Sequence, residues 1–146
     1  PVLGTNPTEK LLTNGIRGSL KYSDFEWCSW ADNDSVSFTI DLLKLEMLNT
    51  LILGCITNNG MAIHKPASVR VEVSDDNSKF REAVVQSFTS EEIFREGNFI
   101  ENLSLKLGGT QARYVRVTAK GPGVCPASHV RPGQTSRIFF DEVMLE

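Results

Sequence analysis

Apolar and polar residues alternate along several short segments of this chain. The pattern is clearest in residues 36–42, where Val36, Phe38 and Ile40 are separated by single polar residues. A period of two residues predicts a β-strand with one buried and one exposed face. Similar signals lie at residues 69–73, 80–88, 103–107, 113–119 and 138–145. The chain is therefore expected to consist mostly of short strands.

Turn residues punctuate these segments. Asp and Asn at residues 75–78 favour a tight turn that would make a hairpin of the flanking segments. Gly108-Gly109 is expected to end the strand before it. Residues 51–57 are nearly all apolar, which is typical of a strand covered on both faces. Short strands separated by frequent turns predict an all-β sandwich or barrel.

A single short helix is expected. Ser90 would cap residues 91–95, where acidic residues in the first turn suit the helix dipole, and Gly97 would end the segment. There is no alternation of strands with long helices, and no phosphate-binding loop or dinucleotide-binding glycine motif occurs.

Composition narrows the functional classes. The 146 residues carry a net charge of −3 and are 40% hydrophobic, which is enough for one folded domain. An acidic chain with a pI near 5.4 does not fit nucleic-acid binding, which uses a basic surface. No run of 18 apolar residues is present that would predict a membrane-spanning helix.

The chain starts at Pro1 and not at an initiator Met. We therefore expect an excised module from which a signal peptide or earlier domains have been cut away, and the missing targeting signal says nothing about the parent protein. We expect residues 1–10 to be a linker or the start of the piece, and residues 11–146 to form the module.

Three cysteines, Cys28, Cys55 and Cys125, lack CxxC or zinc-finger spacing. One interpretation is that they are small buried apolar residues. The alternative is one disulfide with a spare thiol. Either way, the chain is not a disulfide-dense scaffold.

Three segments without strand signals are long enough to carry function: residues 13–34, 58–66 and 120–136. The last is rich in Pro and Gly, and a loop of that length inside a compact domain usually has a function.

Several motifs together resemble one known family over nearly the whole chain. They are the opening LTNG loop, the segments FTIDL, VRVEVSDDNSKF and ARYVRVTAKG, and the closing FFDEVMLE. In this order they resemble the discoidin-like, or coagulation factor type C, domain, and its sugar-binding relatives, the family 32 carbohydrate-binding modules. The stretch TAKGPGVCPASHVRPGQ before the closing DEV is most similar to the C-terminal module of bacterial family 20 β-N-acetylhexosaminidases. The resemblance implies an antiparallel β-sandwich (a jelly roll like galactose-binding domains).

The resemblance also implies a structural Ca²⁺ ion. Leu11 would give a carbonyl, Asn14 a side-chain oxygen, Ser19 a hydroxyl or carbonyl and Glu142 a carboxylate, an oxygen set that suits calcium. The family typically has Asp where Asn14 stands and Thr where Ser19 stands, so one negative charge is lost and calcium should bind more weakly. Alternatively, Asn14 belongs to a simple turn and Glu142 pairs with a nearby arginine.

Sugar recognition needs aromatic faces and planar or charged hydrogen-bonding groups. The candidate residues come from the three loops, which the resemblance would bring to one end of the sandwich: Trp27, Trp30, Asn58, Asn59, His64, Lys120, His129 and Arg131. Each also has an ordinary interpretation, as a core tryptophan, a turn residue or a solvated loop side chain.

The sequence lacks the GxSxG and HExxH motifs, and no acid pair stands out as a glycosidase centre. The resemblance, together with the loop residues, implies a non-catalytic carbohydrate-binding module of a larger exported bacterial glycoside hydrolase, which would be periplasmic, cell-surface or extracellular. The expected ligands are terminal galactose, N-acetylgalactosamine or N-acetylglucosamine. A structural alternative is packing against the parent catalytic domain through an apolar patch at Phe25, Trp30, Met61 and Ile63. A third is protein or phospholipid binding through Met61 and Ile63 at a loop tip.

Overall fold

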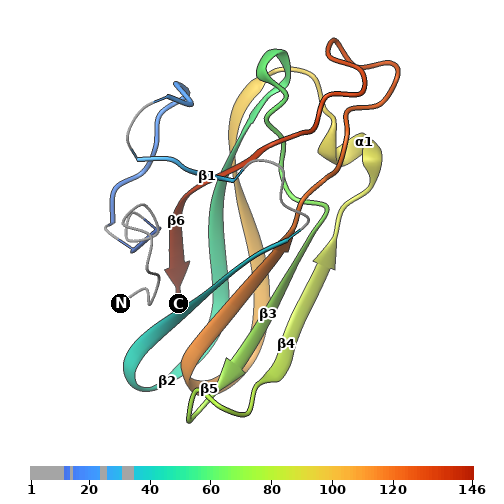
Figure 1. Ribbon diagram of the computed structural model, residues 1–146. Coiled ribbons are helices and arrows are strands. Elements are labelled where there is room, and N and C mark those ends of the chain that lie inside the picture. The colour runs from blue at the N-terminus through green and yellow to red at the C-terminus, as the bar shows by residue number, and fades with distance from the viewer. Residues whose placement is uncertain (1–11, 14, 24–25, 31–34) are drawn as a thin grey trace.

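The computed structural model describes residues 12–13, 15–23, 26–30 and 35–146. The predicted linker at residues 1–10 lies outside this part of the chain. The described residues form six strands, a short α-helix and one 3-10 turn (Figure 1). Their bounds are β1 (Cys28–Trp30), β2 (Ser35–Asn58), η2 (Asn59–Met61), β3 (Ser68–Ser74), β4 (Arg81–Ser87), α1 (Ser90–Ile93), β5 (Asn98–Lys120) and β6 (Ile138–Leu145).

The strands form one antiparallel sheet in the order β1-β6-β2-β5-β3-β4. Strands β2 and β5 are 24 and 23 residues long, and both bend sharply at the lower end of Figure 1. Residues 35–41 of β2 pair with residues 114–120 of β5, whose other edge pairs with β3, whereas residues 51–55 of β2 lie between β5 and β6. The sheet therefore folds over on itself into two layers, and the predicted antiparallel β-sandwich is confirmed.

The bend corrects one prediction from the sequence. Gly108 and Gly109 do not end a strand, because β5 continues through them. Both have left-handed backbone angles, with φ of 71° and 72°, which glycine adopts at little cost. Leu43 on the facing turn of β2 also has a positive φ of 71°. Asp41 Oδ1 accepts a hydrogen bond from the Leu43 amide at 2.8 Å and helps to hold that conformation.

Asp41 also accepts two hydrogen bonds from the Arg113 guanidinium, at 2.8 and 2.9 Å. This pairing, opposed by partial burial and supported by the Leu43 amide, lowers the pKa of Asp41 from 3.8 to about 2. Because the folded pKa lies below the unfolded one, the stabilisation is complete above about pH 4 and is lost as the pH falls through about 2. We expect the difference in Tm between the natural chain and Asp41→Asn to shrink over that range in thermal melts. A difference independent of pH would contradict this role.

The core lies between the two layers and follows the predicted alternation. Val36, Phe38 and Ile40 from β2 are buried against Val71 and Val117 from the neighbouring strands. Residues 51–57 are covered on both faces, as predicted, because a second apolar cluster lies outside β2. Its buried members are Trp27, Ile56, Ile63 and Phe139.

The helix is shorter than predicted, and the three cysteines do not form a disulfide. The N-cap of α1 is Thr89 and not Ser90, because Thr89 Oγ1 accepts the Glu92 amide and the Glu92 side chain accepts the Thr89 amide. The helix ends at Ile93, short of the predicted last residue, Arg95. All three cysteines are buried thiols outside any disulfide.

Candidate functional site

Three segments distant in sequence meet at the upper end of Figure 1: the turn after β2, the region around α1, and the loop between β5 and β6. Backbone hydrogen bonds join them, from Asn59 N to Gly97 O at 3.0 Å and from His64 N to Arg137 O at 3.0 Å. The long Pro/Gly-rich loop is itself ordered by bonds such as Cys125 N to Gln134 O at 2.8 Å. The loops at this end of the sandwich therefore form a surface that is held together by backbone hydrogen bonds.

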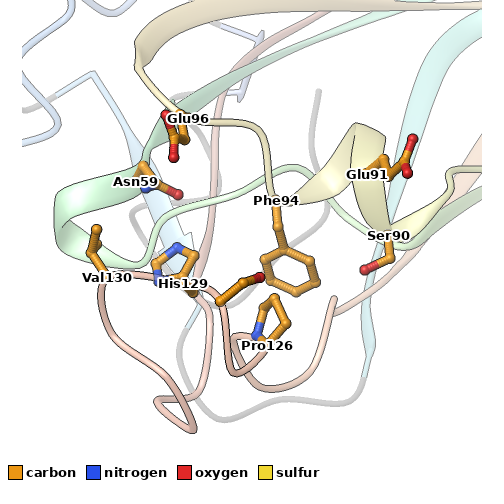
Figure 2. A pocket seen from close by; sticks show the side chains of 9 residues that line it. Asn59, Ser90, Glu91, Phe94, Glu96, Pro126, His129 and Val130 are labelled. Carbon is orange, nitrogen blue, oxygen red and sulfur yellow. The ribbon is translucent and has the colours of Figure 1, made fainter.

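A pocket of about 380 Å³ lies among these segments. Figure 2 shows the Phe94 ring in the middle of the lining, with Pro126 and His129 beside it. The lining residues are Asn59, Ser90, Glu91, Phe94, Glu96, Pro126, Ser128, His129 and Val130. The pocket thus combines an aromatic face with hydroxyl, amide and carboxylate groups, and its lining contains neither Lys nor Arg.

An aromatic triangle supports the pocket. The His64 ring centroid is 5.0 Å from that of Phe94 and 5.1 Å from that of His129, in edge-to-face arrangements. His64 is completely buried and His129 nearly so, whereas Phe94 is half-buried. Edge-to-face pairs of this kind fix ring orientation. Phe94 is therefore held in place with part of its surface free for a ligand.

A hydrogen bond joins the two histidine side chains. His64 Nε2 and His129 Nε2 lie 3.0 Å apart, and the Arg131 amide donates to His129 Nδ1 at 2.9 Å. A neutral His129 must therefore carry its proton on Nε2 and donate it to His64, whose own proton lies on Nδ1. Burial, together with the charge of His129, lowers the pKa of His64 to about 4, against a smaller opposing effect of the Ile93 backbone. His64 is therefore neutral at neutral pH.

One acceptor in the pocket lacks a partner. Asn59 is buried, and its Oδ1 makes no hydrogen bond within the described part of the protein. Leaving a buried polar atom unsatisfied costs free energy comparable with a lost hydrogen bond. Asn59 Oδ1 is therefore an acceptor beside the pocket that the fold itself leaves unsatisfied.

Of the eight predicted sugar-binding residues, Asn59 and His129 line the pocket and His64 lies buried beside His129. Arg131 follows His129, but its side chain binds Gly60 O and Gln134 on the exposed side of the loop. The remaining predicted residues lie elsewhere.

Both tryptophans are part of the apolar interior. Trp27 is buried, and its Nε1 donates to Ser19 O at 2.9 Å. Trp30 is half-buried against Phe140, with ring centroids 5.6 Å apart. Neither tryptophan lines the pocket around Phe94. Both pack against the apolar interior, as the alternative interpretation of a core tryptophan describes.

Asn58 and Lys120 also lie outside the pocket. The Asn58 backbone pairs with Ile63 in a short bridge, so Asn58 is the turn residue of the ordinary interpretation. Lys120 lines a separate hollow on the β2–β5–β3 layer together with Ser35 and Arg70.

The predicted metal ligands are only partly described. Leu11 and Asn14 lie outside the described residues. Ser19 O accepts the Trp27 indole, and Glu142 Oε2 accepts the Gly15 amide at 2.9 Å. Burial raises the pKa of Glu142, and the Gly15 amide opposes that rise.

The arginine of the alternative interpretation pairs with the neighbouring acid. Arg17 Nε donates to Asp141 Oδ2 at 2.8 Å, and the Gly18 amide donates to the same oxygen at 2.9 Å. The opening loop and β6 are therefore joined through two adjacent carboxylates, Asp141 and Glu142, with or without a metal.

Sequence reasoning missed the residues contributed by the α1 region, above all Phe94, Glu91 and Glu96. A signal was present, because Phe94 is an aromatic residue among charged ones outside any alternating segment. An aromatic residue at such a position lies outside the strands of the core, so part of its ring can be exposed to a ligand.

Fold and pocket together define a β-sandwich binding module whose site is built from loops at one end. The F5/8 type C domain model matches residues 3–131, and the chain belongs to this family. F5/8 type C domains are generally non-catalytic modules. No curated protein sequence matches the chain.

Solved structures with a similar fold include carbohydrate-binding modules and a domain of an enzyme. CpGH89CBM32-6 of Clostridium perfringens is 15% identical with a TM-score of 0.59, covering 100% of this chain and 90% of that one. The CBM32 of AlyQ, solved with 4,5-unsaturated mannuronic acid, is 16% identical with a TM-score of 0.60, covering 100% and 92%. The C-terminal domain of a chitobiase from Bacteroides fragilis is 16% identical with a TM-score of 0.54, covering 94% and 78%. These likenesses confirm the fold.

Among the described residues, no helix is both long and apolar enough to cross a membrane.

Proposed function

We propose that the chain is a non-catalytic carbohydrate-binding module of a larger exported bacterial glycoside hydrolase, and that it binds a terminal sugar in the pocket around Phe94. The observation that carries the proposal is the buried, unsatisfied Oδ1 of Asn59 in a pocket with an aromatic face. The C–H face of a sugar packs against an aromatic ring, while its hydroxyls need fixed acceptors and donors. The pocket offers both.

The charge of the pocket selects among sugars. Glu91 and Glu96 line it, and no basic side chain is part of the lining to compensate an acidic ligand. A uronic acid such as the one bound by the AlyQ module would meet like charge. We therefore propose neutral hexoses and N-acetylhexosamines as ligands: galactose, N-acetylgalactosamine or N-acetylglucosamine.

The same glutamates do not favour catalysis. A glycosidase needs a general acid whose pKa is raised by an apolar environment, opposite a second carboxylate. Glu91 and Glu96 are exposed side chains at the rim. The module would act by targeting, because even a weak site raises the effective concentration of a linked enzyme at its glycan.

Isothermal titration with the three sugars tests the site. We expect Asn59→Ala to weaken binding roughly fivefold, because a hydrogen bond contributes about 1 kcal/mol. Asn49→Ala is the matched control, since Asn49 is an exposed residue near the bend of β2, which lies at the opposite end of the sandwich from the pocket. Equal affinities of the two variants would contradict the proposed site.

We propose calcium as a structural ion at the junction of the opening loop and β6. Among the described residues, the buried carboxylate of Glu142 fits a hard cation, which would compensate its charge. Calcium would connect the opening loop to β6 and would have a structural role only. The ion would then raise Tm, and a chelator would lower it, without Asn59 being involved.

A second candidate is packing against the parent catalytic domain. The patch first expected for it does not form, because Ile63 is buried and Trp30 packs on Phe140, while Phe25 lies outside the described residues. The burial of Ile63 also removes the predicted apolar loop tip for phospholipid. A different group favours packing: Leu43, Leu45 and Met47 at the bend of β2 are 66%, 52% and 58% exposed. Lysine substitutions there should weaken the packing of the module against the parent catalytic domain and leave the sugar affinity unchanged.

A further inference from the structure

Behind the pocket, three side chains with metal-binding atoms lie together. One ligand atom each from His64, Cys125 and His129 lies within 4.8 Å of the other two. All three residues are buried, at 0%, 2% and 8% exposure. Cys125 and His129 belong to the loop between β5 and β6, whereas His64 follows the turn after β2. The fold thus brings two imidazoles and a thiol to one point.

We propose that the His64–Cys125–His129 cluster binds one Zn²⁺ ion. Imidazole nitrogens and a cysteine thiolate are the ligands that zinc prefers. Two nitrogens held about 2.05 Å from a tetrahedral ion lie about 3.3 Å apart. The two Nε2 atoms are 3.0 Å apart and need to open by a few tenths of an ångström. A zinc-bound thiolate sulfur lies about 3.6 Å from each nitrogen, so the Cys125 side chain, whose ligand atom is within 4.8 Å of the other two, would close on them as the ion binds.

The ligands are held by backbone structure. Cys125 N donates to Gln134 O at 2.8 Å, Gly133 N donates to Cys125 O at 2.9 Å, and His129 N donates to Pro126 O at 3.0 Å. His64 N donates to Arg137 O at 3.0 Å. The site is therefore largely formed before the ion arrives, which reduces the ordering cost of binding.

The protons balance in a defined way. His64 carries its proton on Nδ1, and its Nε2 lone pair, which accepts the His129 proton in the metal-free chain, becomes available to the ion when that proton leaves His129 Nε2. His129 must transfer its proton from Nε2 to Nδ1, which breaks the hydrogen bond from the Arg131 amide. Cys125 loses its thiol proton to solvent, so one proton is released for each zinc ion bound.

The cluster supplies three of the four ligands of a tetrahedral site. His129 also lines the pocket, so water or a ligand atom from that side would supply the fourth. Zinc would also tie the long loop to the turn after β2, and bound ion would raise the Tm of the chain. The inference goes beyond the proposed sugar binding and does not depend on it.

The test uses the 146-residue chain in excess calcium, so that any calcium site is filled. Titration with ZnCl₂ is expected to give one tightly bound zinc per chain and a higher Tm. Co²⁺ in place of zinc should give a sulfur-to-cobalt charge-transfer band in the near ultraviolet. Cys125→Ser should lose that band, and His64→Phe should weaken zinc binding at least tenfold. Cys55→Ala is the control, because Cys55 is a buried thiol outside the cluster and its loss should leave the band unchanged.

The cobalt spectrum of the natural chain keeps the test decisive even if a variant does not fold. No stoichiometric zinc, or cobalt bound without the sulfur band, would overturn the proposal and leave the histidines as a hydrogen-bonded pair. Titrating the three sugars with the zinc-free and zinc-loaded chain separates the two ideas. Zinc binding without sugar binding would reject the proposed function alone, and sugar binding without zinc would reject this inference alone.

Discussion

Gly54→Ala is expected to destabilise the chain by about 3 kcal/mol. A Cβ on Gly54 would overlap Asp141 Oδ1 and lie 2.6 Å from Arg17 Nη2. Asp141 is completely buried, and its other oxygen holds Arg17 and the Gly18 amide. The new methyl group would therefore displace a buried carboxylate from its partners. Urea unfolding of the natural chain and the variant measures the difference.

Gly60→Ala is the matched control for this prediction. A Cβ there would meet only Asn58 Oδ1, at an ordinary contact of 3.7 Å. The same substitution should change the free energy of unfolding by less than about 1 kcal/mol. Similar losses for both variants would mean that any Gly-to-Ala change is costly in this chain, and the role of the Asp141 pair would be rejected.

The second large effect is expected for Leu51→Ala, at about 2–5 kcal/mol. Leu51 is completely buried in the core on β2, so truncation removes apolar contacts and leaves a cavity. Leu45→Ala, in the same strand, removes a side chain that is 52% exposed, and should cost under about 0.5 kcal/mol. Thermal melts of the two variants give the comparison.

Because both changes are Leu to Ala in β2, helix or strand propensity does not distinguish them. We expect Leu51→Ala to lower the Tm far more than Leu45→Ala does. If Leu45→Ala proved as costly as Leu51→Ala, the exposed group at the bend would already be covered, for example by a second copy of the chain.

The strands were predictable because a half-buried strand leaves a local pattern. Alternation at residues 36–42 and 69–73 reports directly which side chains face the core. The bend was not predictable in the same way. Gly108-Gly109 has the composition of a strand end, and only the pairing of β5 with β2 on both sides shows that the strand continues.

The site was predicted in part. Asn59 and His129 stood out because they are polar residues in loops without strand signals. Phe94 was not predicted. Its place in the pocket depends on the α1 region lying beside a loop some 30 residues later, and a contact between such distant segments leaves no local pattern in the sequence. Trp27 shows the opposite case, since a loop aromatic can equally cover the outside of a strand.

The central claim is that the pocket around Phe94 binds a terminal sugar. The most direct measurement is a glycan array probed with the natural chain and with Asn59→Ala, each in calcium and in chelator. We expect signals on terminal neutral hexoses or N-acetylhexosamines and none on uronic acids, and we expect these signals to be lost in Asn59→Ala and retained in Asn49→Ala. Calcium should affect these signals only through the stability of the chain. A blank array for the folded natural chain, or signals unchanged by Asn59→Ala, would contradict it.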